Sequence, residues 1–290
     1  MIVCPSCESS FKITTKVCPT CGFTPEIHDG FECWAPELAL EGDGFNPDCF
    51  SSLARNEEGH FWFAARNRLI LWSLKKYFSQ LGSFLEVGCG TGYVLRGVAK
   101  SFSDANLFGS EIFVSGLKFA AARVQCATLV QMDARRVPYF KEFDVVAAFD
   151  VLEHINEDGK ALLGLYSAVK PGGGVVLTVP QHTWLWSRAD DCACHKRRYS
   201  CRELHALVES AGFRIIRSTS FVSLLLPAMI ISRFQRWKEV PQENEQSNEF
   251  NLHPLLNSIL FGILLVEEFM IRCGFNFPFG GSRLVVARRD

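Results

Sequence analysis

Short apolar runs alternate with amphipathic stretches through the middle of the chain. The stretch from His60 to Phe78 repeats apolar residues near helical spacing, which predicts a helix leading into the main domain. After it come five apolar runs of strand length, at 83–88, 106–111, 127–131, 143–149 and 174–180. Strands that alternate with helices and are apolar on both faces predict an α/β fold, with a mostly parallel sheet covered by helices on both sides.

Helix and strand signals continue beyond these runs. Leu162 and Leu165 mark one face of a helix, and the PGGG sequence at 171–174 is expected to stop it. Ser200 and Glu203 form a capping-box pattern that predicts a helix ending at Gly212. Two further apolar runs, FRIIRSTSFV from Phe213 and SRLVVARR from Ser282, bring the predicted sheet to seven strands.

Residues 223–280 separate the last two predicted strands and read as a helical insertion. Their two apolar stretches flank the polar segment KEVPQENEQSNEFN. Pro227, Glu267 and Glu268 interrupt these stretches, so we expect them to be shorter than the roughly 18 residues needed to span a bilayer. The insertion is expected to pack on the core, cover a pocket, form an oligomer interface or touch a lipid surface.

Two matched C-x-x-C pairs occupy the N-terminus, CPSC at 4–7 and CPTC at 18–21. Such knuckles turn two thiolates toward one ion, which favours a structural zinc ribbon over a redox pair. We therefore divide the chain into a ribbon at 1–24, a Pro- and Gly-rich linker at 25–58 and the main domain at 59–290. The predicted zinc ligands are Cys4, Cys7, Cys18 and Cys21. A second cluster, for which the C-x-C spacing gives no support, would comprise Cys192, Cys194, His195 and Cys201.

Charge and cysteine content restrict the cellular setting. Thirty basic and thirty-one acidic residues leave a net charge of −1, so there is no overall electrostatic case for binding nucleic acid. Twelve cysteines without a preceding charged and apolar signal segment indicate a reducing compartment. We expect a cytoplasmic protein. Residues 223–280 are the segment through which it would contact the cytoplasmic face of the membrane.

A glycine-rich turn follows the first strand, in the sequence FLEVGCGTGYVL at 84–95. Glycines at a strand-to-helix turn let a ligand lie against the backbone, with N–H groups at the helix start facing it. Acidic residues follow the next three strands: Glu111, Asp133 and Asp150. Because open α/β sheets bind ligands at the carboxyl ends of their strands, we expect these carboxylates around one nucleotide-like ligand.

The ordered segments LEVGCGTG, GSEI, MDA, FDVVAAFDVLEHI and VKPGGGVVLTVP resemble the motifs of class I S-adenosylmethionine-dependent methyltransferases, particularly the branch similar to ubiquinone and menaquinone biosynthesis enzymes. The resemblance covers residues 60–222, with SRLVVARR as the final strand, and implies a Rossmann-like methyltransferase sheet. It also implies S-adenosylmethionine as the cofactor. The G-x-G-x-G pattern, which follows an acidic residue, disfavours a nicotinamide-binding dehydrogenase.

Residue roles follow from the resemblance. The glycine loop and Glu86 would hold the methionine portion, Glu111 the ribose, Asp133 with Ala134 the adenine, and Asp150 would lie beside the methionine end. The predicted cofactor-binding residues are Glu86, Val87, Gly88, Cys89, Gly90, Gly92, Glu111, Ile112, Asp133, Ala134 and Asp150.

A hydroxyl acceptor would need a general base, for which histidine suits neutral pH. We predict His182, just after the fifth strand, and His154 as catalytic candidates, with His195 as a further histidine in the same region. An acceptor pocket for an anionic or phosphate-bearing ligand is predicted from Trp184, Trp186, Arg188, Arg197, Arg198 and Tyr199.

These features predict an enzyme that methylates a small molecule, such as a glycan, a lipid-linked intermediate or a quinone-like compound. The main alternative is an RNA methyltransferase that uses the zinc ribbon to bind its substrate. A second alternative is a binding module whose methyltransferase fold has lost activity, which the intact motif set disfavours.

Overall fold

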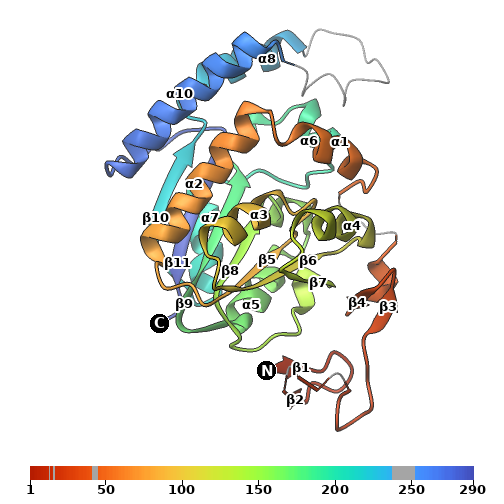
Figure 1. The fold of residues 1–290 in the computed structure, drawn as a ribbon. Helices are drawn as coiled ribbons and strands as arrows, with labels where there is room; N and C mark the ends of the chain where they lie inside the picture. The colour runs from red at the N-terminus through yellow and green to blue at the C-terminus, as the bar shows by residue number, and fades with distance from the viewer. Residues whose placement is uncertain (13, 16, 41–44, 237–251) are drawn as a thin grey trace.

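The computed structural model describes residues 1–12, 14–15, 17–40, 45–236 and 252–290, without the side chains of 234–236. Its centre is a nine-stranded sheet in the order β10-β11-β9-β8-β5-β6-β7-β4-β3 (Figure 1). The strands in chain order are β3 (Glu26–His28), β4 (Phe31–Cys33), β5 (Ser83–Val87), β6 (Asn106–Glu111), β7 (Thr128–Gln131), β8 (Phe143–Phe149), β9 (Val169–Pro180), β10 (Arg214–Phe221) and β11 (Ser282–Arg288).

Six neighbouring strands, from β4 to β9, run parallel, whereas β11 is antiparallel to both of its neighbours. Strand β5 is buried at every position, and β8 at all but Asp144. Strands buried on both faces carry continuous apolar runs, and these runs are why the strands could be predicted from the sequence. The parallel α/β fold is thus confirmed.

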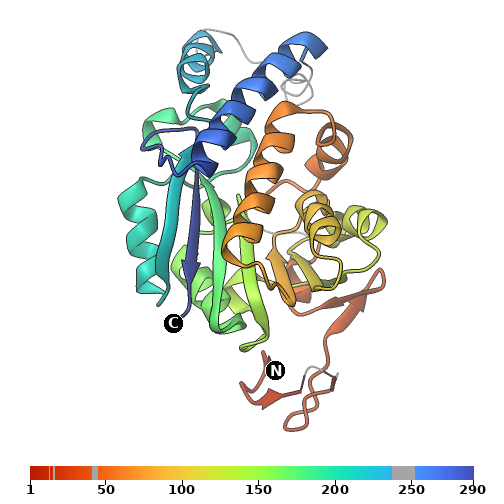
Figure 2. The same cartoon turned by 60° about the vertical axis from the view of Figure 1, so that its left-hand side comes forward.

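Helices cover both faces of the sheet, and Figure 2 shows them in a view turned by 60° from that of Figure 1. One core contains side chains of α2 (Phe61–Tyr77), α3 (Tyr93–Ser101) and α10 (Pro254–Arg272), and the other contains those of α5 (Asp158–Ala168) and α7 (Cys201–Ser210). The remaining α-helices of the described chain are α1 (Cys49–Asn56), α4 (Val114–Arg123), α6 (Arg188–Cys192) and α8 (Leu226–Arg236).

Local signals placed several element ends correctly. His60 accepts a hydrogen bond from the backbone N–H of Trp62 and begins α2, and Ser200 and Glu203 form the predicted capping box of α7. The helix predicted before PGGG ends at Ala168. The strand after it starts at Val169 rather than 174, because β9 already pairs with β8 there, across a register shift.

The sheet has nine strands rather than the predicted seven, because residues of the predicted linker extend it. Strands β3 and β4 form a hairpin, and β4 pairs in parallel with β7. Each is only three residues long. A strand this short carries too little alternation to be detected from sequence, so its pairing with β7 is visible only in three dimensions.

The N-terminal cysteine module packs on the main domain. Its hairpin consists of β1 (Ile2–Val3) and β2 (Ser10–Phe11), and the Val3 N–H donates to the Pro138 carbonyl at 2.7 Å. Ile2 and Phe11 join the same core cluster as β8 and α5. Figures 1 and 2 place this module at the end of the molecule opposite α8 and α10.

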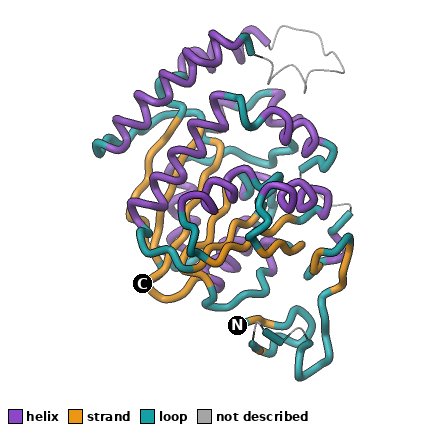
Figure 3. Tube along the Cα trace, in the orientation of Figure 1, coloured by secondary structure: helices purple, strands orange, loops and turns teal. Residues whose placement is uncertain are grey.

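The predicted insertion contains α8 and α10, which form the outer helical layer seen at the top of Figure 3. Among the described residues, one helix, α10, is long and apolar enough to cross a membrane, judged by length and composition alone. Only 22% of its 18-residue apolar stretch is buried. This corrects the expectation of short, interrupted stretches. Pro227 lies in the first turn of α8, where proline is tolerated, and Glu267 and Glu268 point inward. The polar segment at 238–251 lies outside the described residues.

Candidate active site

A cavity of about 1540 Å³ opens at the carboxyl ends of the parallel strands. The glycine loop, Glu111, Asp133 and Asp150 line one part of it. Residues of α1, α2, α6, α8 and α10, with the loops around them, line the rest. A pocket for one small ligand usually measures about 300–1,000 Å³, so this cavity has room for a cofactor and a second molecule.

The glycine loop needs glycine for conformation and for space. Gly88, Gly90 and Gly92 all have positive φ angles, of 69°, 52° and 77°. A Cβ on Gly88 would lie 2.4 Å from a methyl carbon of Val151, and one on Gly92 would lie 2.9 Å from the Ala120 Cα. Gly88 and Gly90 also line the cavity, so bare backbone faces it there, which fits a ligand that approaches closely.

Glu86 is a buried carboxyl group at the end of β5. Within the described structure its Oε2 has no hydrogen-bond partner. Burial raises its pKa to about 8, against a smaller opposing effect of the Arg66 guanidinium. A buried acceptor with a free oxygen is suited to a cationic ligand group, and the amine of the methionine portion would supply one.

Glu111 fixes the loop that it faces. Its Oε2 accepts a hydrogen bond from the Gly90 N–H at 3.0 Å, and its Oε1 accepts one from the Ile112 N–H at 2.8 Å. Burial still raises the pKa of this carboxyl, because desolvation outweighs these backbone donors. Glu111 thus joins the end of β6 to the glycine loop at the cavity wall.

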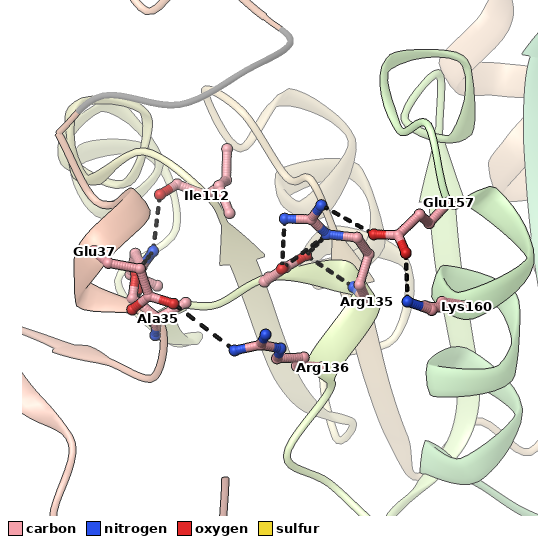
Figure 4. Close-up of polar contacts among 9 residues, drawn as sticks. Ala35, Glu37, Ile112, Arg135, Arg136, Glu157 and Lys160 are labelled. Atoms are coloured by element: carbon pink, nitrogen blue, oxygen red, sulfur yellow. Dashed lines mark hydrogen bonds and ion pairs between the residues drawn. The ribbon is translucent and has the colours of Figure 1, made fainter. Parts of the chain in front are cut away.

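Asp133 follows β7 and is held by an arginine. Its Oδ1 accepts from the Arg135 N–H at 2.9 Å, and Arg135 Nη2 lies 2.8 Å from its Oδ2. Arg135 also contacts Glu157 at 3.4 Å (Figure 4). Asp133 and Ala134 both line the cavity, and the carboxylate of Asp133 is paired with Arg135.

The predicted linker supplies part of this wall. The side-chain amide of Gln131 accepts from the Ala35 N–H at 3.1 Å and donates to the carbonyls of Ala35 at 2.8 Å and Ile112 at 3.0 Å. Leu38 then lines the cavity. The amide of Gln131 therefore holds the segment after β4 beside the predicted adenine end.

A second contribution of the linker is α1. The buried Glu57, next to α1, accepts from the Thr91 hydroxyl at 2.8 Å and pairs with Arg123 at 2.5 Å. Phe50 Cε1 lies 3.8 Å from the position that a Cβ of Gly90 would take. Sequence reasoning missed Phe50 and Glu57, because no motif or periodicity marks residues 45–57.

Asp150 is paired with a buried arginine of α2. Arg66 Nη2 lies 2.5 Å from Asp150 Oδ2, and the Thr178 hydroxyl donates to Oδ1 at 3.2 Å. The Arg66 guanidinium also lies over the Trp62 ring, 5.1 Å from its centroid. The ion pair fixes Asp150, which has a positive φ of 55°, at the cavity wall.

The two predicted catalytic histidines occupy different settings. His154 lines the cavity, and its Nδ1 has no hydrogen-bond partner among the described residues. Burial lowers its pKa to about 4, so its ring is neutral at pH 7. His182 is not among the cavity-lining residues. It stacks between Trp184 and Phe279, with centroid distances of 5.1 and 5.5 Å.

The predicted acceptor pocket is assembled in part. Trp184, Trp186, Arg188 and Arg198 line the cavity together with His195. Arg197 and Tyr199 are not among its lining residues; each contacts Asp158 Oδ2 at 2.7 Å instead.

A buried carboxylate orients His195. Its Nδ1 lies 2.9 Å from Asp190 Oδ1, and Arg198 Nε donates to the same oxygen at 2.6 Å. These charged partners hold the pKa of Asp190 down at about 2, although burial opposes them.

The four N-terminal cysteines meet at one point. The Sγ atoms of Cys4 and Cys21 are 3.6 Å apart, those of Cys7 and Cys18 are 3.7 Å apart, and all four lie within 4.8 Å of one another. A Zn–S bond of about 2.3 Å places tetrahedral thiolates roughly 3.8 Å apart. The residues present therefore fit a four-thiolate zinc ion.

Comparison with known proteins identifies a family and several relatives. Residues 54–218 match the family described as a methyltransferase domain. The chain is 29% identical over 162 residues to the uncharacterised methyltransferase YdaC of Bacillus subtilis, covering 54% of this chain and 86% of that protein. It is 28% identical to the ubiquinone biosynthesis O-methyltransferase of Rhodopseudomonas palustris, over 34% of this chain and 40% of that enzyme.

Solved structures show the same fold. The phosphoethanolamine N-methyltransferase 2 of Haemonchus contortus, solved with S-adenosyl-L-methionine, has a TM-score of 0.51 at 18% identity, over 76% of this chain and 51% of that one. The geranyl diphosphate C-methyltransferase of Streptomyces coelicolor has a TM-score of 0.51 at 12% identity, over 76% and 80%. The chain thus spans about half or less of two of these four relatives. With the family match, the fold and the cavity in agreement, the chain belongs to the methyltransferase-domain family and is a class I S-adenosylmethionine-dependent methyltransferase.

Proposed function

We propose that this enzyme transfers the methyl group of S-adenosylmethionine to an oxygen of a hydrophobic, lipid-linked or quinone-like small molecule. The observation that carries the proposal is that one continuous cavity joins the glycine loop to a second region beneath α8 and α10. A second region of this kind lets the acceptor lie directly against the cofactor's methyl end. The relative from Rhodopseudomonas palustris supports oxygen as the acceptor atom.

The cofactor would occupy the part of the cavity lined by the strand ends. Glu86 would face the methionine amine, Glu111 the ribose hydroxyls, and Asp133 with Ala134 the adenine. When bound, the cofactor supplies a methyl group that its sulfonium already activates. The protein then needs to align the acceptor, exclude water and accept a proton.

His154 is the base that the geometry favours for a hydroxyl acceptor. Its neutral ring lines the cavity, and Nδ1 is free of hydrogen bonds within the described residues. Asp150 is close enough to affect the pKa of His154, which supports a position of the histidine near the proposed methionine end of the pocket. The acceptor's proton would pass to Nδ1 as its oxygen bonds to the methyl carbon.

The acceptor region combines apolar and cationic side chains. Leu225, Met229 and Leu260 line it from the insertion, and Arg198 and Arg233 line it as well. Apolar walls with a few cationic groups suit an amphipathic molecule that has an anionic or polar head.

The outer face of α10 supports delivery from a membrane surface. Leu255, Ile259, Val266 and Phe269 are each more than half exposed, and their spacing follows one side of the helix. Trp184 and Trp186, which line the cavity, are also exposed. Exposed aliphatic and aromatic side chains on an outer helix and at the rim of a pocket are typical of proteins that lie on lipid.

Methyl-labelled S-adenosylmethionine tests the activity. Cell extract is split into a membrane fraction and an aqueous fraction, and each is incubated with the enzyme. We expect label in solvent-extractable lipid from the membrane fraction, and none with Asp150→Asn. Label confined to the aqueous fraction would overturn the lipid assignment, and label in RNA would favour the RNA methyltransferase.

Vesicle co-sedimentation tests the membrane contact separately. The full chain should sediment with phosphatidylglycerol-containing vesicles, and Phe269→Glu should reduce this several-fold. Leu163→Glu is the matched control, because Leu163 is also exposed but lies on α5. Equal loss of vesicle binding in both variants would contradict lipid binding by this face. A stable dimer that dissociates in the Phe269→Glu variant would contradict it as well.

We also propose that the ribbon holds one structural zinc ion through Cys4, Cys7, Cys18 and Cys21. Four thiolates leave no open coordination position, so the ion would serve folding rather than chemistry. The ribbon lies at the end of the molecule opposite α8 and α10 (Figure 1), so a small acceptor near those helices would not touch it.

A further inference from the structure

A cluster of one buried carboxylate and two imidazoles lies in the acceptor part of the cavity. Glu153, His154 and His195 each offer a ligand atom, and these atoms lie within 4.8 Å of one another. His195 Nε2 is 4.0 Å from Glu153 Oε1, and the two imidazole rings meet edge to face with centroids 4.9 Å apart. All three residues line the cavity.

The side-chain carboxyl group of Glu153 has no hydrogen bond from another residue. It is fully buried, and among the described residues neither oxygen accepts a hydrogen bond from a side chain or from another residue's backbone. The nearby arginines are bonded to other groups: Arg66 pairs with Asp150, and Arg198 pairs with Asp190. A buried carboxyl group without partners is costly unless a cation or ligand satisfies it.

Both histidines are arranged as metal ligands usually are. His195 Nδ1 contacts Asp190 Oδ1 at 2.9 Å, which turns Nε2 toward Glu153. The ring of His154 makes a backbone hydrogen bond to Cys194, while its Nδ1 is without one. A carboxylate or backbone carbonyl behind the imidazole is the standard outer contact of a histidine that binds a metal.

From this geometry we infer that Glu153, His154 and His195 form a binding site for one divalent first-row transition metal ion. Ligand bonds of about 2.0–2.2 Å place ligand atoms roughly 3–4 Å apart, so small side-chain rotations would close the cluster. Two imidazoles and one carboxylate leave coordination positions open toward the cavity.

The site deepens the proposed function and rests on it for its role. A metal ion at the acceptor end would bind an acceptor oxygen and favour its deprotonated form. His154 would then act as a ligand rather than as the base, and the acceptor's proton would pass to solvent when the oxygen binds the ion. Binding of the metal by itself requires no acceptor, so it can be tested directly.

Co²⁺ titration of the full chain carrying one equivalent of zinc, held by the four cysteines, is the test, because thiolate and imidazole ligands give different spectra. Thiolate ligands produce intense near-ultraviolet bands, whereas imidazole and carboxylate ligands produce only weak visible bands. We expect visible bands that saturate at one equivalent and lack the near-ultraviolet component. His195→Ala and Glu153→Gln should weaken Co²⁺ binding by at least about 100-fold, and Asp190→Asn by about 10–100-fold.

His28→Ala is the matched control, because His28 lies on β3 away from the cavity and should leave the bands unchanged. Calorimetry with S-adenosylmethionine on the same samples shows whether each variant is folded. Wild-type protein that binds S-adenosylmethionine but gives no visible bands would overturn the metal site and leave the proposed function intact. Bands that survive both His195→Ala and His154→Asn would also overturn it. Bands without S-adenosylmethionine binding would retain the site and refute the proposed function.

Discussion

Glu86 makes the stability of this protein depend on pH in a way that can be calculated. Burial raises the pKa of Glu86 to about 8 from an ordinary value of 4.5. Between about pH 5 and about pH 8 the folded chain therefore holds a proton that the unfolded chain has lost. Stability contributed by this residue falls as the pH rises, because the folded state binds more protons.

The full difference in pKa corresponds to about 5 kcal/mol, since each pKa unit is worth about 1.4 kcal/mol. Between about pH 5 and about pH 8, the free energy of unfolding should fall by roughly 3–4 kcal/mol through Glu86 alone. Glu86→Gln keeps the shape and removes the titration. The variant should therefore become more stable relative to wild type as the pH rises.

Urea unfolding of both proteins at four pH values across this range measures the effect. Other titrating groups, including Glu111 and Glu153, are present in both proteins and largely cancel in the difference. A difference between variant and wild type that stays constant across the range would refute a raised pKa for Glu86.

The same residue links cofactor binding to proton release. If Glu86 faces the methionine amine, S-adenosylmethionine favours the charged carboxylate, so wild-type affinity should rise from about pH 6 to about pH 8. The affinity of Glu86→Gln should be lower and nearly flat. Calorimetry in two buffers of different ionisation enthalpy should detect proton release near pH 7 in wild type only; its absence there would remove Glu86 from the amine contact.

Three further predictions concern the ribbon, the loop and His182. Metal analysis should find one zinc per chain in wild type and in Cys126→Ser, a control at an exposed cysteine, but a deficit in Cys18→Ser; a zinc content near zero in gently purified wild type would refute the ribbon. Gly92→Ala should lower the free energy of unfolding by at least about 1–2 kcal/mol, because φ is 77° and the new Cβ meets the Ala120 backbone; urea unfolding with a loss under about 0.5 kcal/mol would contradict this. His182→Ala should remove the ring that stacks on the cavity-lining Trp184, and so lower methyl transfer to extract acceptors while leaving S-adenosylmethionine affinity near wild type; equal loss of both would indicate a folding role.

The sequence by itself determined the central sheet and the cofactor motifs. Strands such as β5 and β8 are buried on both faces, so their continuous apolar runs can be recognised from sequence without knowing which strands pair with them. Glu111 and Asp150 could be placed at one edge for the same reason, because parallel strands bring their carboxyl ends together.

Tertiary structure decided whatever depends on contacts between distant segments. The pairing of β4 with β7 and the contact of Glu57 with Thr91 join the predicted linker to the cofactor wall, and neither carries a local pattern. The meeting of Glu153 with His195 across a loop is equally invisible in the sequence. Local periodicity indicates which face of a single element is buried. The cavity wall, the inward-facing glutamates of α10 and the ligand cluster depend on how several elements pack together.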